Sequence, residues 1–248
     1  MNKEEIPIST SAVLRSFRLQ FPATCIITGP SDSGKTFLLS RLLVSGANAF
    51  DIRGKIDRVI YCYDTYVEST FKYLAENGLQ VELIKGIPED VERFEFDSTL
   101  NNVIIFDDLA DQAVKSRVVS KFFTQDSHHK RVFVFLLSQN FYTSGIEATT
   151  ISKNATYNIL MKNIQANQIR IYASQNYSSS DRANNLIKSY ELISEASPYG
   201  YLLVDRTKFV APEYSLRTDI LKGFNCVVLT DKFSAAAGSR YYYNNDGR

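Results

Sequence analysis

An eight-residue segment near the N-terminus constrains the fold most strongly, because it fits the pattern G-x-x-x-x-G-K-[ST]. The segment consists of Gly29, Pro30, Ser31, Asp32, Ser33, Gly34, Lys35 and Thr36. The apolar run 22–28 precedes it, and the helical pattern 35–45 follows it. Glycines let such a segment turn tightly, so that successive N–H groups and the start of the helix surround an anionic phosphate. We therefore expect all eight residues to bind the phosphates of ATP.

Two polar side chains at the end of this segment have more specific expected roles. The ammonium group of Lys35 would reach the β- and γ-phosphates, which makes it a catalytic candidate. The hydroxyl group of Thr36 would be a ligand of Mg²⁺. ATP and Mg²⁺ are therefore the expected ligands of the chain.

Two adjacent carboxylates, Asp107 and Asp108, end the apolar run 102–107. Because ligands of open α/β sheets bind at the carboxyl ends of the strands, both should lie near the phosphates. We expect Asp107 to approach the magnesium ion held by Thr36, and Asp108 to polarise the water that attacks the γ-phosphate. Taken alone, an apolar run followed by two aspartates also fits a solvated turn.

A third polar strand end follows the run 131–137, where the sequence continues Ser138-Gln139-Asn140. The amide of Gln139 can donate a hydrogen bond to a phosphate and accept one from an attacking water. Gln139 is therefore a third catalytic candidate, after Lys35 and Asp108. An ordinary polar turn is the alternative interpretation.

Short apolar runs alternate with helical patterns along the chain, which predicts an α/β fold with a mostly parallel central sheet flanked by helices. We expect one P-loop ATPase domain over residues 1–232, followed by a disordered tail over 233–248, where aliphatic residues are few. The expected strands are 22–28, 58–63, 81–85, 102–107, 131–137, 157–162 and 200–205. The expected helices are 35–45 and the neighbourhoods of 66–77, 112–124, 165–175 and 180–194.

Composition restricts the partners of the chain less strongly than the motifs do. The net charge of +1 excludes a uniformly basic surface but allows a local basic patch. Cys25 and Cys62 lie in apolar runs and are expected to be reduced core thiols, which favours an intracellular location. No apolar run reaches the ~18 residues of a membrane span, so no membrane partner is expected.

Three segments, GPSDSGKT, VIIFDDL and FLLSQN, occur in an order that resembles the additional-strand P-loop NTPases. Within that group the chain resembles the FtsK/HerA-like superfamily of DNA-pumping motors. It is most similar to the genome-packaging ATPases of double-stranded DNA viruses, including those of the poxvirus and Polinton (Maverick) types. The resemblance extends over about residues 20–221. Further segments that carry it are 127–130, 133–141, 152–157, 198–205 and 216–218.

This resemblance implies a homo-oligomeric ring that uses ATP to push double-stranded DNA into a capsid. The implied partners are double-stranded DNA, further copies of the chain and a capsid or portal-like protein. The implied location is the host cytoplasm or nucleus, with association with the virion as a further possibility. A ring would also let one subunit supply an arginine to the ATP of its neighbour. The candidates are Arg117, Arg131 and Arg217, of which we favour Arg131.

Other classes of P-loop protein stay open as alternatives. A ring-forming helicase or AAA-type remodeller would need the same phosphate loop and acidic strand end. A small-molecule kinase is less favoured, because the pair Asp107 and Asp108 suits the activation of water.

Overall fold

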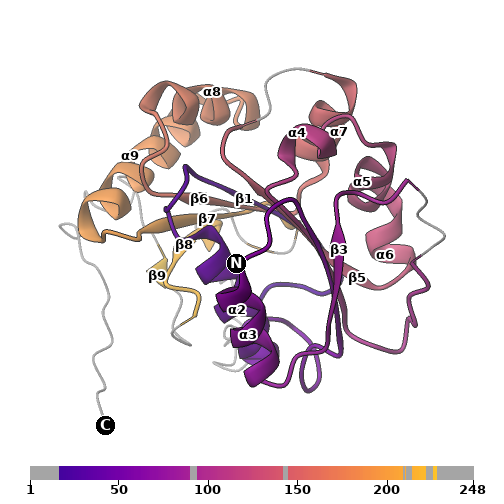
Figure 1. Ribbon diagram of the computed structural model, residues 1–248. Helices are drawn as coiled ribbons and strands as arrows, with labels where there is room; N and C mark the ends of the chain where they lie inside the picture. The colour runs from indigo at the N-terminus through magenta and orange to yellow at the C-terminus, as the bar shows by residue number, and fades with distance from the viewer. Residues whose placement is uncertain are drawn as a thin grey trace, which may run out of the picture.

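The computed structural model describes residues 17–89, 94–141, 145–208, 210, 214–221 and, for the backbone alone, 226–227. The tail expected over 233–248 lies outside these residues. Within the described part of the chain, nine strands form one sheet (Figure 1). The strands are β1 Thr24–Thr28, β2 Arg58–Tyr63, β3 Val81–Lys85, β4 Asn102–Asp107, β5 Val132–Ser138, β6 Tyr157–Met161, β7 Tyr201–Asp205, β8 Leu216–Thr218 and β9 Cys226–Val227.

The strands follow the order β3-β2-β4-β5-β1-β6-β7-β8-β9 across the sheet. All pairings from β3 to β6 are parallel, and β7, β8 and β9 add antiparallel strands at one side. The predicted α/β fold with a mostly parallel sheet is therefore confirmed. Each of the seven expected strands is present, with its ends shifted by two residues at most.

Helices cover both faces of the sheet, so the central strands are apolar on both sides. Residues of α2 and α3 pack on one face, against alternate positions such as Ile27 and Ile105. Residues of α4, α5 and α7 pack on the other face, against Ile26 and Ile104, while α8 and α9 cover Leu160. The helices are α2 Lys35–Ser45, α3 Glu68–Glu76, α4 Ala110–Ala113, α5 Arg117–Lys121, α6 Ser127–His129, α7 Ile146–Asn154, α8 Ala166–Asn176 and α9 Ser180–Ala196.

The prediction of one continuous helix near 112–124 is wrong. The structure instead has α4, then α5, then the π-helical turn Phe122–Asp126 and finally α6. The hydroxyl oxygen of Ser116 accepts a hydrogen bond from the backbone N–H of Val119 at 3.3 Å, so Ser116 begins a new helix. A capping residue inside the expected helix therefore marks the break.

Two further differences concern the ends of the sheet and one helix. Strand β3 is an edge strand whose side chains are exposed or half-buried, although its sequence resembles a buried strand. Helix α7 is absent from the sequence prediction, because it has only two buried residues, Ala148 and Ile151, and little apolar periodicity. Strands β8 and β9 are too short for a sequence pattern to reveal them.

The carboxyl ends of the parallel strands meet at one edge of the sheet. Thr28 of β1 is in register with Ser138 of β5, and Tyr63 of β2 is in register with Asp107 of β4. The loops that leave these strand ends therefore lie together, and they contain the polar residues singled out in the sequence. Among the described residues, no helix has the length and apolar character needed to span a membrane.

Candidate functional site

The segment from Gly29 to Gly34 connects β1 to α2 through backbone conformations that few residues adopt. Asp32 and Gly34 have φ angles of 58° and 90°, both in the left-handed region. A Cβ atom on Gly29 would lie 2.5 Å from Cβ of Met161 and 2.7 Å from Oγ of Ser33, so no side chain fits there. The two motif glycines are therefore required by backbone conformation and by close packing.

Lys35 begins α2, and its side chain folds back over the preceding loop. The Nζ atom donates hydrogen bonds to the carbonyl oxygens of Gly29 and Pro30, at 2.7 and 2.8 Å. Burial lowers the pKa of Lys35, and the charges of Asp107, Asp108 and Asp32 oppose this shift. A phosphate in the loop would offer this ammonium group anionic oxygens in place of the two carbonyls.

Asp107 and Thr36 meet beside the start of α2. The hydroxyl group of Thr36 donates to Oδ2 of Asp107 at 3.3 Å, and the hydroxyl group of Tyr61 donates to the same oxygen at 2.5 Å. Burial raises the pKa of Asp107, while the hydrogen bonds from Tyr61 and Thr36 act in the opposite direction. The structure thus brings together the two residues predicted to hold a metal ion.

Tyr61 is a residue of this site that the sequence analysis missed. It lies in β2, where it is in register with Ile105, two residues before Asp107 on the same face of the sheet. Its ring is buried and packs edge-on against Phe71 of α3, with the ring centroids 5.1 Å apart. A tyrosine two residues from the end of the neighbouring strand was the available signal, but β2 and β4 are adjacent only in the folded sheet.

The donor set around Asp107 fits a magnesium ion that is shared with a nucleotide. The hydroxyl group of Thr36 and the carboxylate of Asp107 are hard oxygen donors, which Mg²⁺ prefers. Within the described ranges, no group of three or more His, Cys, Asp or Glu residues could hold a metal ion. A metal ion between Thr36 and Asp107 would therefore complete its coordination with phosphate oxygens and water.

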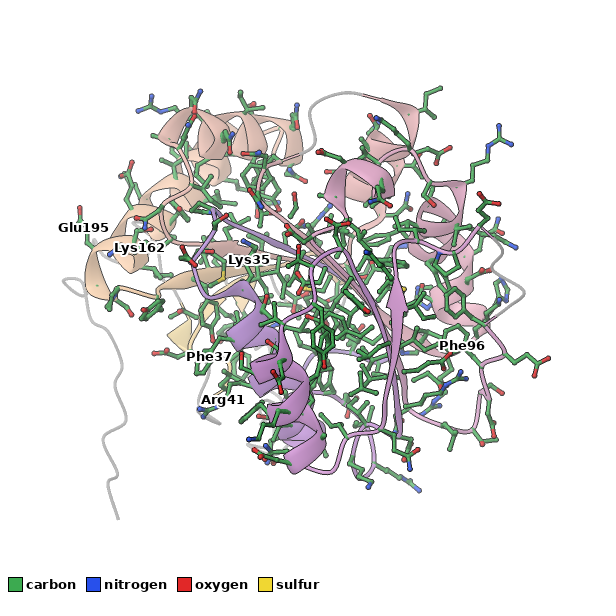
Figure 2. The ribbon with its side chains drawn as sticks, viewed as in Figure 1. Lys35, Phe37, Arg41, Phe96, Lys162 and Glu195 are labelled. Carbon is green, nitrogen blue, oxygen red and sulfur yellow. The ribbon has the colours of Figure 1, made fainter. Side chains whose placement is uncertain are left out.

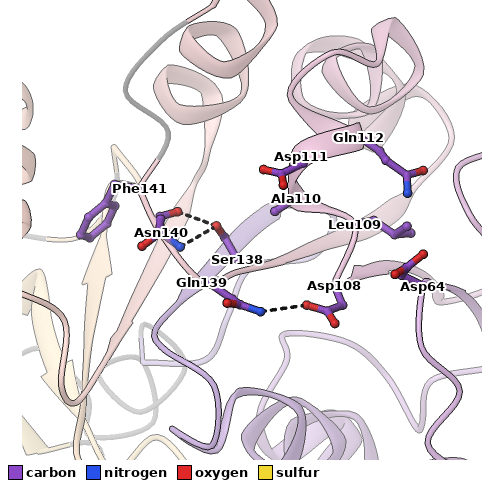
Figure 3. A pocket seen from close by; sticks show the side chains of 10 residues that line it. All are labelled: Asp64, Asp108, Leu109, Ala110, Asp111, Gln112, Ser138, Gln139, Asn140 and Phe141. Carbon is purple, nitrogen blue, oxygen red and sulfur yellow. Dashed lines mark hydrogen bonds between the residues drawn. The ribbon is translucent and has the colours of Figure 1, made fainter.

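Asp108 and Gln139 face each other across a second part of the site (Figure 3). The Nε2 atom of Gln139 donates to Oδ1 of Asp108 at 3.2 Å. Asp108 has a φ angle of 58°, so the chain turns sharply after Asp107 and the two carboxylates have different partners. The pair borders a pocket of about 440 Å³, which adds Asp64 and Asp111 to the acidic groups predicted from sequence. The pocket is lined by Asp64, Asp108, Leu109, Ala110, Asp111, Gln112, Ser138, Gln139, Asn140 and Phe141.

Of the three arginines suggested for donation to a neighbouring subunit, Arg217 is excluded. Its side chain is 0% exposed and forms an ion pair with Asp205, and Nη1 donates to the carbonyl oxygen of Phe17 at 2.7 Å. A buried and paired guanidinium group cannot reach another subunit. Arg117 and Arg131 are both exposed.

Comparison with solved structures finds viral genome-packaging NTPases and a flagellar accessory protein. One is B204, the DNA-packaging ATPase from Sulfolobus turreted icosahedral virus, with 16% identity, a TM-score of 0.48, and coverage of 74% of this chain and 92% of that chain. The genome-packaging NTPase B204 from Sulfolobus turreted icosahedral virus 2, in complex with ATP-gammaS, has 15% identity, a TM-score of 0.46 and the same coverage. The flagellar accessory protein FlaH from Methanocaldococcus jannaschii has 16% identity, a TM-score of 0.41, and coverage of 65% and 80%.

Comparison at the level of sequence gives a family. No curated protein matches the chain at a significant level. The family described as "Poxvirus A32 protein" matches residues 14–233, which include the phosphate loop, Asp107, Asp108 and Gln139. With most of its length matched, the chain belongs to the poxvirus A32 protein family.

Proposed function

We propose that this protein hydrolyses ATP and uses the energy to move double-stranded DNA into a viral capsid. The observation that carries the ATPase part is the convergence of two pairs beside the phosphate loop. Thr36 meets Asp107 at 3.3 Å, and Gln139 meets Asp108 at 3.2 Å. A phosphate loop with separate places for a metal ion and for a water molecule suits hydrolysis rather than binding alone.

In this proposal the first pair and Lys35 bind the phosphates and the metal ion. Lys35 exchanges its two carbonyl partners for oxygens of the β- and γ-phosphates. Thr36 and Asp107 would hold Mg²⁺, which would supply positive charge beside the phosphates. The remaining motif residues, from Gly29 to Gly34, contribute backbone N–H groups that surround the phosphates.

The second pair prepares the nucleophile. Asp108 polarises a water molecule on the γ-phosphate side of the loop, or accepts a proton from that water. Gln139 orients the same water through its amide and keeps Asp108 in place through the hydrogen bond between them. The pocket beside this pair gives the water access to the site.

DNA translocation, ring formation and the capsid partner rest on the resemblance to packaging motors and on membership of the A32 family. A ring would restrict hydrolysis to the assembled state, since the site would then be completed by an arginine from the next subunit. Both exposed candidates, Arg117 and Arg131, are available for that contact.

The test is an ATPase assay of the purified protein with and without duplex DNA, coupled to a measurement of the mass of the particle. We expect Mg²⁺-dependent hydrolysis that duplex DNA stimulates, in a particle of several subunits. Stimulation by single-stranded DNA alone would favour a ring helicase. Absence of hydrolysis in the assembled particle, with or without DNA, would refute the proposal.

A further inference from the structure

Tyr199 is 66% exposed, and its ring lies near Gly34 of the phosphate loop. Tyr199 belongs to the short loop between α9 and β7. A Cβ atom on Gly34 would lie 3.5 Å from Cδ1 of Tyr199, so the edge of the ring and Gly34 are separated by about the space of one methyl group. Exposed aromatic side chains are common on protein surfaces, so exposure alone does not assign a role to Tyr199.

The loop that carries Tyr199 is fastened to the end of β6 by its backbone. The backbone N–H of Lys162 donates to the carbonyl oxygen of Gly200 at 2.8 Å, and Nζ of Lys162 donates to that of Ser197 at 3.1 Å. A Cβ atom on Gly200 would lie 2.4 Å from the carbonyl oxygen of Ile193, so the loop also packs tightly against α9. The backbone that carries Tyr199 is therefore held in place, while the ring itself is not buried.

The strand order indicates which part of a nucleotide would reach this ring. The groups expected at the γ-phosphate, Asp107, Asp108 and Gln139, end β4 and β5 on one side of β1. Tyr199 precedes β7 on the other side of β1, beyond β6. Lys162, which anchors the Tyr199 loop, accordingly lies on the α9 side of Lys35 in Figure 2. A nucleotide with its γ-phosphate near β4 must extend its base away from that strand, toward β6 and β7.

We propose that Tyr199 forms the surface on which the base of the bound nucleotide stacks. This inference rests on the proposed function, because it assumes that a nucleoside triphosphate occupies the phosphate loop. An aromatic ring on an anchored loop offers a planar face to any base, and stacking of this kind is sequence-tolerant because every base has a π-face. Tyr199 would thus add affinity for the nucleoside to the affinity for phosphate that the loop supplies.

A second exposed aromatic residue near the loop provides the competing assignment. Phe37 follows Thr36 on the outer face of α2, is 69% exposed, and has the guanidinium carbon of Arg41 5.8 Å from its ring centroid (Figure 2). The ring of Tyr199, by contrast, is the aromatic side chain that a Cβ atom on the motif residue Gly34 would meet, at 3.5 Å. We therefore assign the base to Tyr199 and use Phe37 as a comparison.

The experiment measures binding of ATP and of inorganic tripolyphosphate by calorimetry, both in the presence of Mg²⁺. The variants are Tyr199→Ala, Tyr199→Phe, Phe37→Ala and the control Tyr214→Ala. Tyr214 is also an exposed tyrosine, but it precedes β8, whose Leu216 pairs with Val204 near the far end of β7. It therefore lies toward the opposite edge of the sheet.

We expect Tyr199→Ala to weaken ATP binding at least fivefold, about the loss of one stacking contact, and to leave tripolyphosphate binding unchanged. Tyr199→Phe and Tyr214→Ala should bind both ligands as the wild type does. Unchanged ATP affinity in Tyr199→Ala, an equal loss for both ligands, or a larger loss in Phe37→Ala would each overturn the inference. A wild-type protein that binds neither ligand would overturn the proposed function instead, and the inference with it.

Discussion

Asp107 and Asp108 are adjacent in the chain but have different partners in the structure. Asp107 receives hydrogen bonds from Thr36 and Tyr61, whereas Asp108 receives one from Gln139. The left-handed backbone at Asp108 causes this separation, because it turns the chain directly after β4. Non-glycine residues in this region are uncommon, and such residues concentrate at functional sites.

The variant Asp108→Asn isolates the charge of this residue, since asparagine tolerates the left-handed conformation and its amide oxygen still accepts from Gln139. We predict that it binds ATP normally and hydrolyses it about 100-fold more slowly, because water activation is lost. Nucleotide binding by calorimetry and single-turnover hydrolysis provide the two measurements. Loss of binding in Asp108→Asn, with normal binding in Asp107→Asn, would show that the two roles are reversed.

Tyr61→Phe removes one hydrogen bond to Asp107 and leaves the ring that packs against Phe71. We predict an apparent Mg²⁺ affinity about 10-fold lower in the presence of ATP, because a ligating carboxylate depends on its hydrogen-bond partners for orientation. A magnesium titration of ATP binding gives the measurement. The control is Tyr157→Phe, which loses a buried hydroxyl group that accepts from the backbone N–H of Gln20. Equal magnesium affinities in the two variants would contradict this role of Tyr61.

At this scale the sequence predicted the phosphate loop and the polar residues at the ends of β4 and β5, and it missed those that β2 contributes. The two motif glycines follow from local backbone demands, so the pattern was sufficient to place the loop. Tyr61 lies in β2 and Asp64 directly follows it, and only the pairing of β2 with β4 places them near Asp107 and Asp108. The sequence wrongly included Arg217 among the candidates for the same reason, because its partner Asp205 lies in the neighbouring strand.

Among the elements, the parallel strands and the helices α2, α3, α8 and α9 were predictable, whereas the connections from β4 to β5 and from β5 to β6 were not. Central strands are continuous apolar runs, which a sequence pattern identifies directly. The region between β4 and β5 depends on local capping at Ser116 and on a π-helical turn, which interrupt the expected helix. The antiparallel strands β8 and β9 have too few residues for a periodic signal.

Strands β7 and β8 are joined by a buried ion pair between Asp205 and Arg217. We predict that Arg217→Ala lowers the free energy of unfolding by about 3–5 kcal/mol, because it leaves Asp205 buried without its partner. Urea denaturation provides the measurement. Lys72→Ala, which breaks the exposed pair with Glu76, should cost no more than about 0.5 kcal/mol. A similar cost for the two variants would contradict the structural role of Arg217.

On the scale of the whole molecule, the residues predicted to bind the nucleotide lie together at the carboxyl ends of the parallel strands. Arg131 lies just before β5, and therefore at the opposite edge from Gln139, which follows the same strand. Arg131 is thus far from the site of its own chain. It can serve ATP hydrolysis only at the site of another subunit, as the proposed ring requires.

Mixing two inactive variants tests for a shared site. Lys35→Ala subunits keep their arginines, and subunits with Arg131→Ala or Arg117→Ala keep their phosphate loop. We predict that the variant lacking the shared arginine loses about 1,000-fold in hydrolysis rate, and that mixing it with Lys35→Ala restores part of the activity. The other arginine variant should hydrolyse ATP as the wild type does. A diluted monomer that hydrolyses ATP at the full rate would contradict a shared site.

The most direct test of the proposed motor is displacement of a third DNA strand from a duplex by the assembled protein. A protein that moves along duplex DNA should strip the third strand when ATP and Mg²⁺ are present. The account predicts displacement with ATP, and none with a non-hydrolysable analogue or in the Asp108→Asn variant. Rapid ATP hydrolysis by the assembled wild-type protein on this DNA, with the third strand left in place, would contradict it.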